Sequence, residues 1–193
     1  MKKTLLALAV AAAALGLSSC DSRPDVAGSW AGEANLPIEG AATSYSRVIY
    51  DLNADGGAVA TYVIDFTKAL PQSTQIVSPY QTSVSATATI SGTWQWLADE
   101  DDELALAFDA STLTVSVDPQ ALEMRANVIT DEQAPELDSL RPQIASLYKA
   151  DVENAIRAHA SALLLDDVKS DGKQLTFEIG DKKYVYNSVH TAE

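Results

Sequence analysis

The run SVSATATISGTWQW, residues 83–96, alternates apolar and polar side chains without a break. Every second residue from Val84 to Trp96 is apolar or glycine, and the residues between them are serine, threonine or glutamine. This period of two is the signature of a strand with one buried face. At about 3.3 Å per residue the strand extends roughly 46 Å, which is longer than most strands in globular proteins.

A strand of this length must bend to stay on a small domain, and Gly92 is the position where a bulge or kink is expected. Long bent strands with one apolar face are what a closed barrel requires. The sequence therefore predicts a mainly β protein, an antiparallel barrel of about eight strands. A two-sheet β-sandwich with a helix is the alternative.

Other segments carry the same alternation. TSYSRVIYDLN (43–53) and GGAVATYVIDF (56–66) read as two strands, and the NADGG between them has the chemistry of a hairpin turn. Two shorter strands are expected over 104–108 and 113–117. QLTFEIGDKKYVYNSV (174–189) reads as two further strands joined at Gly180-Asp181.

One segment, residues 131–165, departs from this pattern and is expected to be helical. From Ser139 to about Leu165 the apolar residues recur at steps of three and four. Ser139 is the expected N-cap, and Pro142 then falls in the first turn, where its missing N–H costs little. The apolar stripe of this helix must be buried, most simply by packing across the barrel. Its expected members are Leu140, Ile144, Leu147, Tyr148, Val152, Ile156 and Leu163.

The first nineteen residues read as an export signal. Lys2 and Lys3 precede a short apolar run, 4–15, that is too short to span a bilayer. Cys20 is the one cysteine of the chain, and a leucine stands three residues before it. This arrangement resembles the lipobox of bacterial lipoproteins, which implies cleavage before Cys20 and acylation of that cysteine. An ordinary secreted protein with a free cysteine is the alternative.

Two or more acyl chains give a durable membrane anchor. Residues 20–27 form a short lipidated tether, so we expect the domain to lie close to a membrane of the bacterial cell envelope, with the outer membrane favoured. Removing residues 1–19 from the 193 leaves 174, a size that suits one domain over 28–190. The formal net charge of −14 becomes −16 without Lys2 and Lys3, which argues against nucleic acid as a partner.

The triplet Gly28-Ser29-Trp30 resembles the Gly-x-Trp signature that opens the first strand of lipocalins. The resemblance covers most of residues 26–190. It implies a barrel whose first tryptophan, Trp30, closes one end. The likeness departs from the family outline at the bulky helical segment and at the two strands that follow it.

The sequence motifs give little support for a catalytic or metal-binding site. DLNADG (51–56) matches the first half of an EF-hand loop, but position twelve is Tyr62 rather than glutamate, so a hairpin turn is favoured. The acidic run 99–103 reads as a solvated tip. The two histidines, His159 and His190, lie far apart in the chain, and there is no Gly-x-Ser-x-Gly motif. We expect no enzyme activity, no cofactor and no metal.

The aromatic residues of the apolar strand faces are the candidate ligand-binding residues. They are Tyr62, Phe66, Trp94 and Trp96. Core packing is the commoner use of such side chains. The expected function is binding of a small apolar ligand by an envelope lipoprotein. A structural or interaction module that binds protein or glycan through its hydroxyl-rich face, 83–95, is the alternative.

Overall fold

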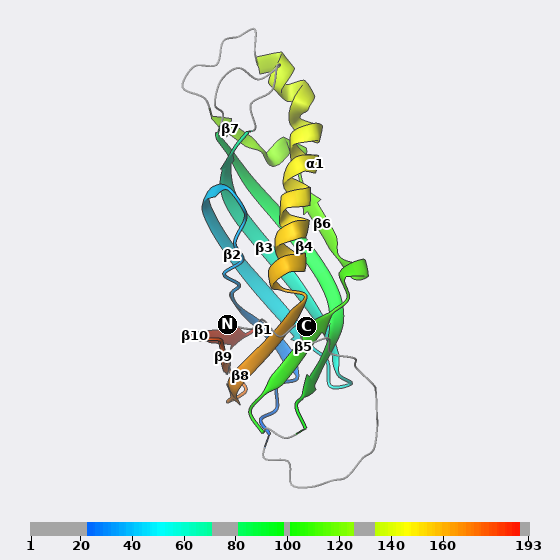
Figure 1. Ribbon diagram of the computed structural model, residues 1–193, viewed down its shortest axis with the longest axis vertical. Coiled ribbons are helices and arrows are strands. Elements are labelled where there is room, and N and C mark those ends of the chain that lie inside the picture. The colour runs from blue at the N-terminus through cyan, green and yellow to red at the C-terminus, as the bar shows by residue number, and fades with distance from the viewer. Residues whose placement is uncertain (1–22, 71–80, 99–100, 126–133, 190–193) are drawn as a thin grey trace, which may run out of the picture.

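The protein is described here by a computed structural model, which covers residues 23–70, 81–98, 101–125 and 134–189 (Figure 1). The described part holds ten strands and one α-helix. The strands are β1 (Gly28–Glu33), β2 (Ala41–Leu52), β3 (Gly57–Ala69), β4 (Gln81–Trp96), β5 (Leu104–Phe108), β6 (Thr114–Val117), β7 (Glu123–Arg125), β8 (Ala162–Ser170), β9 (Gln174–Ile179) and β10 (Lys182–Ser188). The helix is α1 (Ala134–His159), and two short 3₁₀ turns, Ala110–Thr112 and Pro119–Ala121, flank β6.

Eight of these strands close into an antiparallel barrel. The order around the barrel is β1-β2-β3-β4-β5-β8-β9-β10, and β10 pairs with β1 to complete the circuit. Buried and exposed side chains alternate along these strands because one face of each strand is turned to the barrel interior. The predicted barrel of about eight strands is confirmed, and the alternative of two separate sheets does not occur.

β4 belongs both to the barrel and to a sheet that extends beyond it. Its lower end, Gly92–Trp96, pairs with β5, whereas its upper part pairs with β6 and β7. β2, β3 and β4 therefore extend above the barrel as a curved sheet (Figure 1). The register passes through Gly92 without a shift, so the position is not a bulge. A Cβ there would lie 2.1 Å from the carbonyl oxygen of Ala107, and glycine is needed because β5 approaches so closely.

The predicted hairpins are also present. β2 and β3 pair from Ala41↔Lys68 to Leu52↔Ala58. Between them the amide of Asn53 donates to the carbonyl of Gly57 at 2.8 Å, and the carboxylate of Asp55 accepts from the amide of Gly57. The segment that resembles half of an EF-hand loop is thus a turn between strands. β9 and β10 are joined at Gly180, whose φ of +60° lies in the left-handed region that glycine favours.

The helix differs from its predicted bounds. It begins at Ala134, so Ser139 is not its N-cap and Pro142 lies inside it. It ends at His159, and Leu163 and Leu165 belong to β8. Apolar residues at 163, 164 and 165 satisfy a helical and a strand pattern equally, and pairing with β5 and β9 decides between them.

The helix packs into the concave face of the extended sheet. Ile144, Tyr148, Val152 and Ile156 are buried there, whereas Leu147, also expected to be buried, is exposed. The ring of Tyr148 meets Phe66 of β3 edge-on, with centroids 5.7 Å apart. Lys68 pairs with Asp151 at 2.7 Å. The helix therefore fills the upper part of the concavity and ends at the mouth of the barrel.

Trp30 is the buried tryptophan of the core. It lies in β1 near the end of the barrel where the chain enters, and 3% of it is exposed. Its indole N–H donates to the carbonyl of Val26 at 2.8 Å, which satisfies the one polar group of the side chain. No helix within the described ranges is both long and apolar enough to cross a membrane.

Candidate functional site

The barrel wall is incomplete at the seam between β1 and β10. These strands pair only at Trp30↔Ser188 and Ala31↔Asn187. Beyond that point a side chain bridges them, because the hydroxyl of Tyr186 donates to the carbonyl of Glu33 at 2.8 Å. A Cβ on Gly32 would lie 2.0 Å from the ring of Tyr186. Glycine at this position is what lets the ring lie across β1.

Behind this seam lies a cavity of about 260 Å³ at the mouth of the barrel. Its walls come from β2, β3 and β10, which contribute Tyr50, Tyr62, Tyr184 and Tyr186. The end of the helix contributes His159 and Ala160, and Leu163 and Ile179 complete the apolar part. The cavity is thus the space that the helix leaves unfilled where it stops.

A strap formed by residues 34–37 crosses the cavity. It turns away from β1 at Asn35, whose φ of +53° is a left-handed conformation that asparagine tolerates better than most residues. Ser46 holds the strap, since its hydroxyl accepts from the amide of Leu36 at 2.8 Å and its carbonyl accepts from the amide of Ala34 at 2.9 Å. Ser46 is itself buried, so these bonds are shielded from water.

The tyrosine rings form a packed aromatic wall. Tyr50 stacks on Tyr186 with centroids 5.7 Å apart, and Tyr184 meets Tyr186 edge-on at 6.3 Å. Phe177 supports both, at 4.9 Å from Tyr186 and 5.4 Å from Tyr184. Each ring is therefore fixed by its neighbours, and the wall has a preformed shape.

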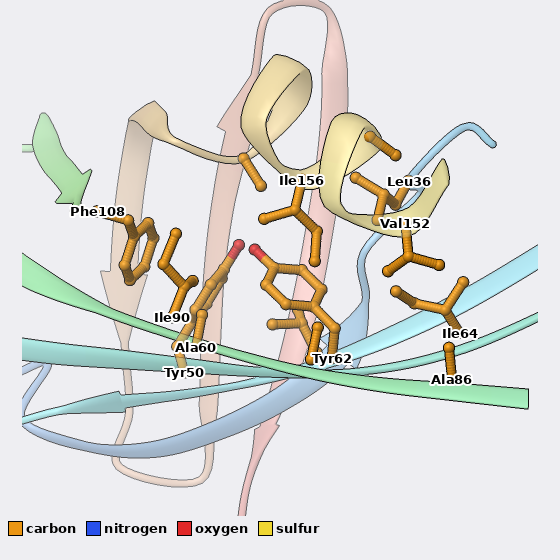
Figure 2. Close-up of a cluster of buried hydrophobic side chains, with 14 of the residues drawn as sticks. Leu36, Tyr50, Ala60, Tyr62, Ile64, Ala86, Ile90, Phe108, Val152 and Ile156 are labelled. Atoms are coloured by element: carbon orange, nitrogen blue, oxygen red, sulfur yellow. The ribbon is translucent and has the colours of Figure 1, made fainter. Parts of the chain in front are cut away.

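The hydroxyl of Tyr62 stands out among the polar groups of the cavity. Figure 2 shows it pointing toward the hydroxyl of Tyr50. Only 1% of Tyr62 is exposed, and no hydrogen bond of ordinary geometry joins its hydroxyl to that of Tyr50 or to any other described residue. Most buried hydroxyls have a partner, so an unpaired one marks a place where a ligand group fits.

Burial keeps these phenols neutral. It raises the pKa of Tyr62 to about 12 and the pKa of Tyr50 well above its ordinary value. Burial also raises the pKa of Tyr186. Near neutral pH all three are phenols that donate a hydrogen bond. They are therefore suited to orienting a polar group on a ligand rather than to carrying charge.

The four aromatic residues that the sequence predicted as ligand-binding do not meet in one place. Tyr62 lines the cavity, whereas Phe66 packs beneath the helix against Tyr148. Trp94 and Trp96 are half-buried at the opposite end of the barrel. The indole N–H of Trp94 donates there to the carbonyl of Asn53 at 2.8 Å.

Several residues of the cavity were missed by the sequence analysis. Tyr184 and Tyr186 alternate with Lys183, Val185 and Asn187 in KYVYN (183–187), so period-two patterning was a signal that they share an inward face. The signal for Asn35 and Gly32 lies in backbone geometry, which a single sequence does not display. His159, expected to be packed or at a rim, is at the rim of the cavity. Cys20 and His190 lie outside the described residues.

Larger hollows occur elsewhere but are open to solvent. The largest of those described, about 860 Å³, lies between the start of β1 and the turn before β9, beside Asp25 and Asp171. Another, of about 420 Å³, lies at the upper edge of the extended sheet beside Thr43 and Glu123. Neither has a buried polar group without a partner among its lining residues. The tyrosine cavity is the better candidate site.

The fold and the cavity define a class, a small antiparallel barrel with an interior site at its mouth. Comparison of the chain with protein-family models and with curated proteins found no match. The resemblance of Gly28 and Trp30 to the lipocalin signature therefore stays an expectation. The function has to be argued from the cavity itself.

Proposed function

We propose that the protein is a non-enzymatic, lipid-anchored protein of the bacterial cell envelope whose barrel binds one small, mainly apolar molecule in the tyrosine cavity. The observation that carries this proposal is the preformed cavity of about 260 Å³, with its aromatic wall and one unpaired buried hydroxyl. Interior sites that are mostly apolar with a few placed polar groups are the usual form of small-molecule sites.

The anchoring part of the proposal rests on Cys20 and the leucine three residues before it. Arg23, only three residues after Cys20, donates from its guanidinium to the carbonyl of Leu97 at 2.9 Å. A lipid on Cys20 would thus hold the barrel next to the membrane, and we favour the outer membrane. Mass spectrometry of the membrane fraction should show loss of residues 1–19 and an acylated Cys20. A soluble mature chain with an unmodified cysteine would overturn this part.

The binding part is tested by native mass spectrometry of protein purified from its own host. A small molecule should remain bound to the natural chain and be lost from Ala34→Phe, because the new ring occupies the cavity that Ala34 lines. Ala31→Phe is the matched control, since Ala31 lies three residues earlier, in β1, on the face opposite to the buried Trp30. Absence of any bound molecule from the natural chain would count against binding.

An interaction module is the second candidate, and one feature of the outer face favours it. Thr61, Thr89 and Thr114 lie side by side on β3, β4 and β6, in a row of hydroxyls across the sheet. Neighbouring strands place such groups about 4.8 Å apart, a spacing that suits polar contact with a glycan or a protein. Replacing Thr89 by lysine would disturb the row and leave the cavity unchanged. Loss of a co-purifying protein or glycan from Thr89→Lys but not from Ala34→Phe would favour this candidate.

A further inference from the structure

The unpaired hydroxyl of Tyr62 restricts what the cavity accepts. An unpaired hydroxyl in an apolar surrounding costs about 1–3 kcal/mol, and a ligand oxygen beside it would remove that cost. The hydroxyl of a neutral phenol both donates and accepts, and its O–H is paired only by an acceptor on the ligand, such as a carbonyl or hydroxyl oxygen. A ligand without an oxygen or nitrogen acceptor would leave this O–H buried with nothing to donate to.

The charge of the ligand is restricted by what surrounds the cavity. Among the described residues that line it there is no aspartate, glutamate, lysine or arginine. An anion would have no lysine or arginine to pair with, since His159 at the rim is the one basic side chain of the lining, and the carboxyl end of α1, which carries partial negative charge, lies at the same rim. A cation would have no carboxylate to pair with, and the Tyr184 ring already has the ammonium of Lys182 at 5.2 Å from its centroid. Burying an unpaired ion is costly, so a neutral molecule fits best.

The size and shape of the cavity restrict the ligand further. A volume of about 260 Å³ equals that of roughly nine liquid water molecules at ~30 Å³ each, which is room for one ring with a short substituent. The lining is largely aromatic, with Tyr50, Tyr184 and Tyr186 in contact with one another. Flat aromatic molecules pack on such rings in offset or edge-on arrangements.

From these three restrictions we infer that the tyrosine cavity binds neutral single-ring aromatic compounds that carry an oxygen acceptor, and that the hydroxyl of Tyr62 donates to this oxygen. The inference rests on the proposed binding function and adds the class of ligand to it. It also assigns Tyr62 the role of selecting polar over purely apolar ligands of the same size.

Four probes of similar size test the inference. They are acetophenone, which is neutral with a carbonyl acceptor, toluene, which has no polar group, benzoate and benzylammonium. The full chain carrying Cys20→Ser, which cannot be acylated, is titrated with each probe, and dissociation constants are taken from chemical-shift changes in ¹H–¹⁵N spectra. Acetophenone should bind most tightly, and the amides of Ala160 and Leu163 at the cavity should be among those that shift.

The variant Tyr62→Phe isolates the hydrogen bond. A neutral hydrogen bond contributes about 0.5–1.5 kcal/mol, so the affinity for acetophenone should fall about 2- to 12-fold while that for toluene stays the same. Tyr45→Phe is the control, because Tyr45 is exposed on the outside of β2 and lines other hollows. It should change neither affinity.

Other outcomes separate the inference from the proposed function. Equal affinities for toluene and acetophenone, unchanged by Tyr62→Phe, would overturn the role of Tyr62 and leave binding in the cavity intact. Tighter binding of benzoate or benzylammonium would overturn the neutral class. A molecule that co-purifies from the host while none of the four probes binds would overturn the ligand class alone. Failure of all probes together with no co-purifying molecule would overturn both.

Discussion

Replacing Tyr62 by phenylalanine should stabilise the free protein, although it removes a polar group from the proposed ligand site. The hydroxyl of Tyr62 is buried and has no partner among the described residues, so its removal relieves a desolvation cost of about 1–3 kcal/mol. The ring stays in place, and only the volume of one oxygen is lost. We expect a gain of about 1 kcal/mol, because the oxygen also loses some packing contact.

Tyr186→Phe is the matched comparison. The hydroxyl of Tyr186 donates to the carbonyl of Glu33 at 2.8 Å, so its removal loses a hydrogen bond that contributes about 1 kcal/mol. The same chemical change should therefore stabilise the protein at position 62 and destabilise it at position 186. Both rings are buried in the same hydrophobic core and line the same cavity, which keeps the surroundings alike.

The change in stability of each variant is measured by thermal and urea unfolding. For a domain of this size, 1 kcal/mol corresponds to a change in Tm of about 2–4 °C. The Tm of Tyr62→Phe should rise by about this amount, and the Tm of Tyr186→Phe should fall. A loss of stability in Tyr62→Phe comparable to that of Tyr186→Phe would refute the reasoning, because it would show that the hydroxyl of Tyr62 has a partner in the free protein.

Other predictions concern pH and packing. Burial raises the pKa of Tyr62 to about 12 from an unfolded value near 10, so the contribution of Tyr62 to stability is full below pH 10 and should be lost at about 1.4 kcal/mol per pH unit between pH 10 and about 12, measured by urea unfolding. Gly32→Ala should cost about 1–3 kcal/mol, since its Cβ would lie 2.0 Å from the ring of Tyr186; an unchanged Tm would contradict this close approach. Trp30→Ala should cost about 3–5 kcal/mol, and half-buried Trp94→Ala clearly less; equal losses would place both rings in the core.

The strands were predictable because each has one buried face. In β4 the residues Val84, Ala86, Ala88 and Ile90 are all buried, as the alternation in the sequence required. The helix was predictable as an element but not in its bounds. The residues around Leu163 fit both periods, and only pairing with β5, far away in the sequence, makes them a strand.

The candidate site was predictable only in part. Alternation shows which face of a strand a side chain lies on, and it placed Tyr62 correctly in the interior. It does not show how high along the barrel a residue lies, so Trp94 and Trp96 were grouped with Tyr62 although they lie at the other end. The cavity also depends on β10 meeting β1, a pairing between the two ends of the domain that no local pattern encodes.

The claim that the tyrosine cavity is the binding site is tested most directly by intermolecular nuclear Overhauser effects between bound acetophenone and the protein. Cross-peaks from the ligand to the rings of Tyr62 and Tyr186 and to the methyl groups of Leu163 are the predicted result, because these side chains line the cavity. Cross-peaks to Trp94 and Trp96 at the opposite end of the barrel, with none to Tyr62, would contradict it.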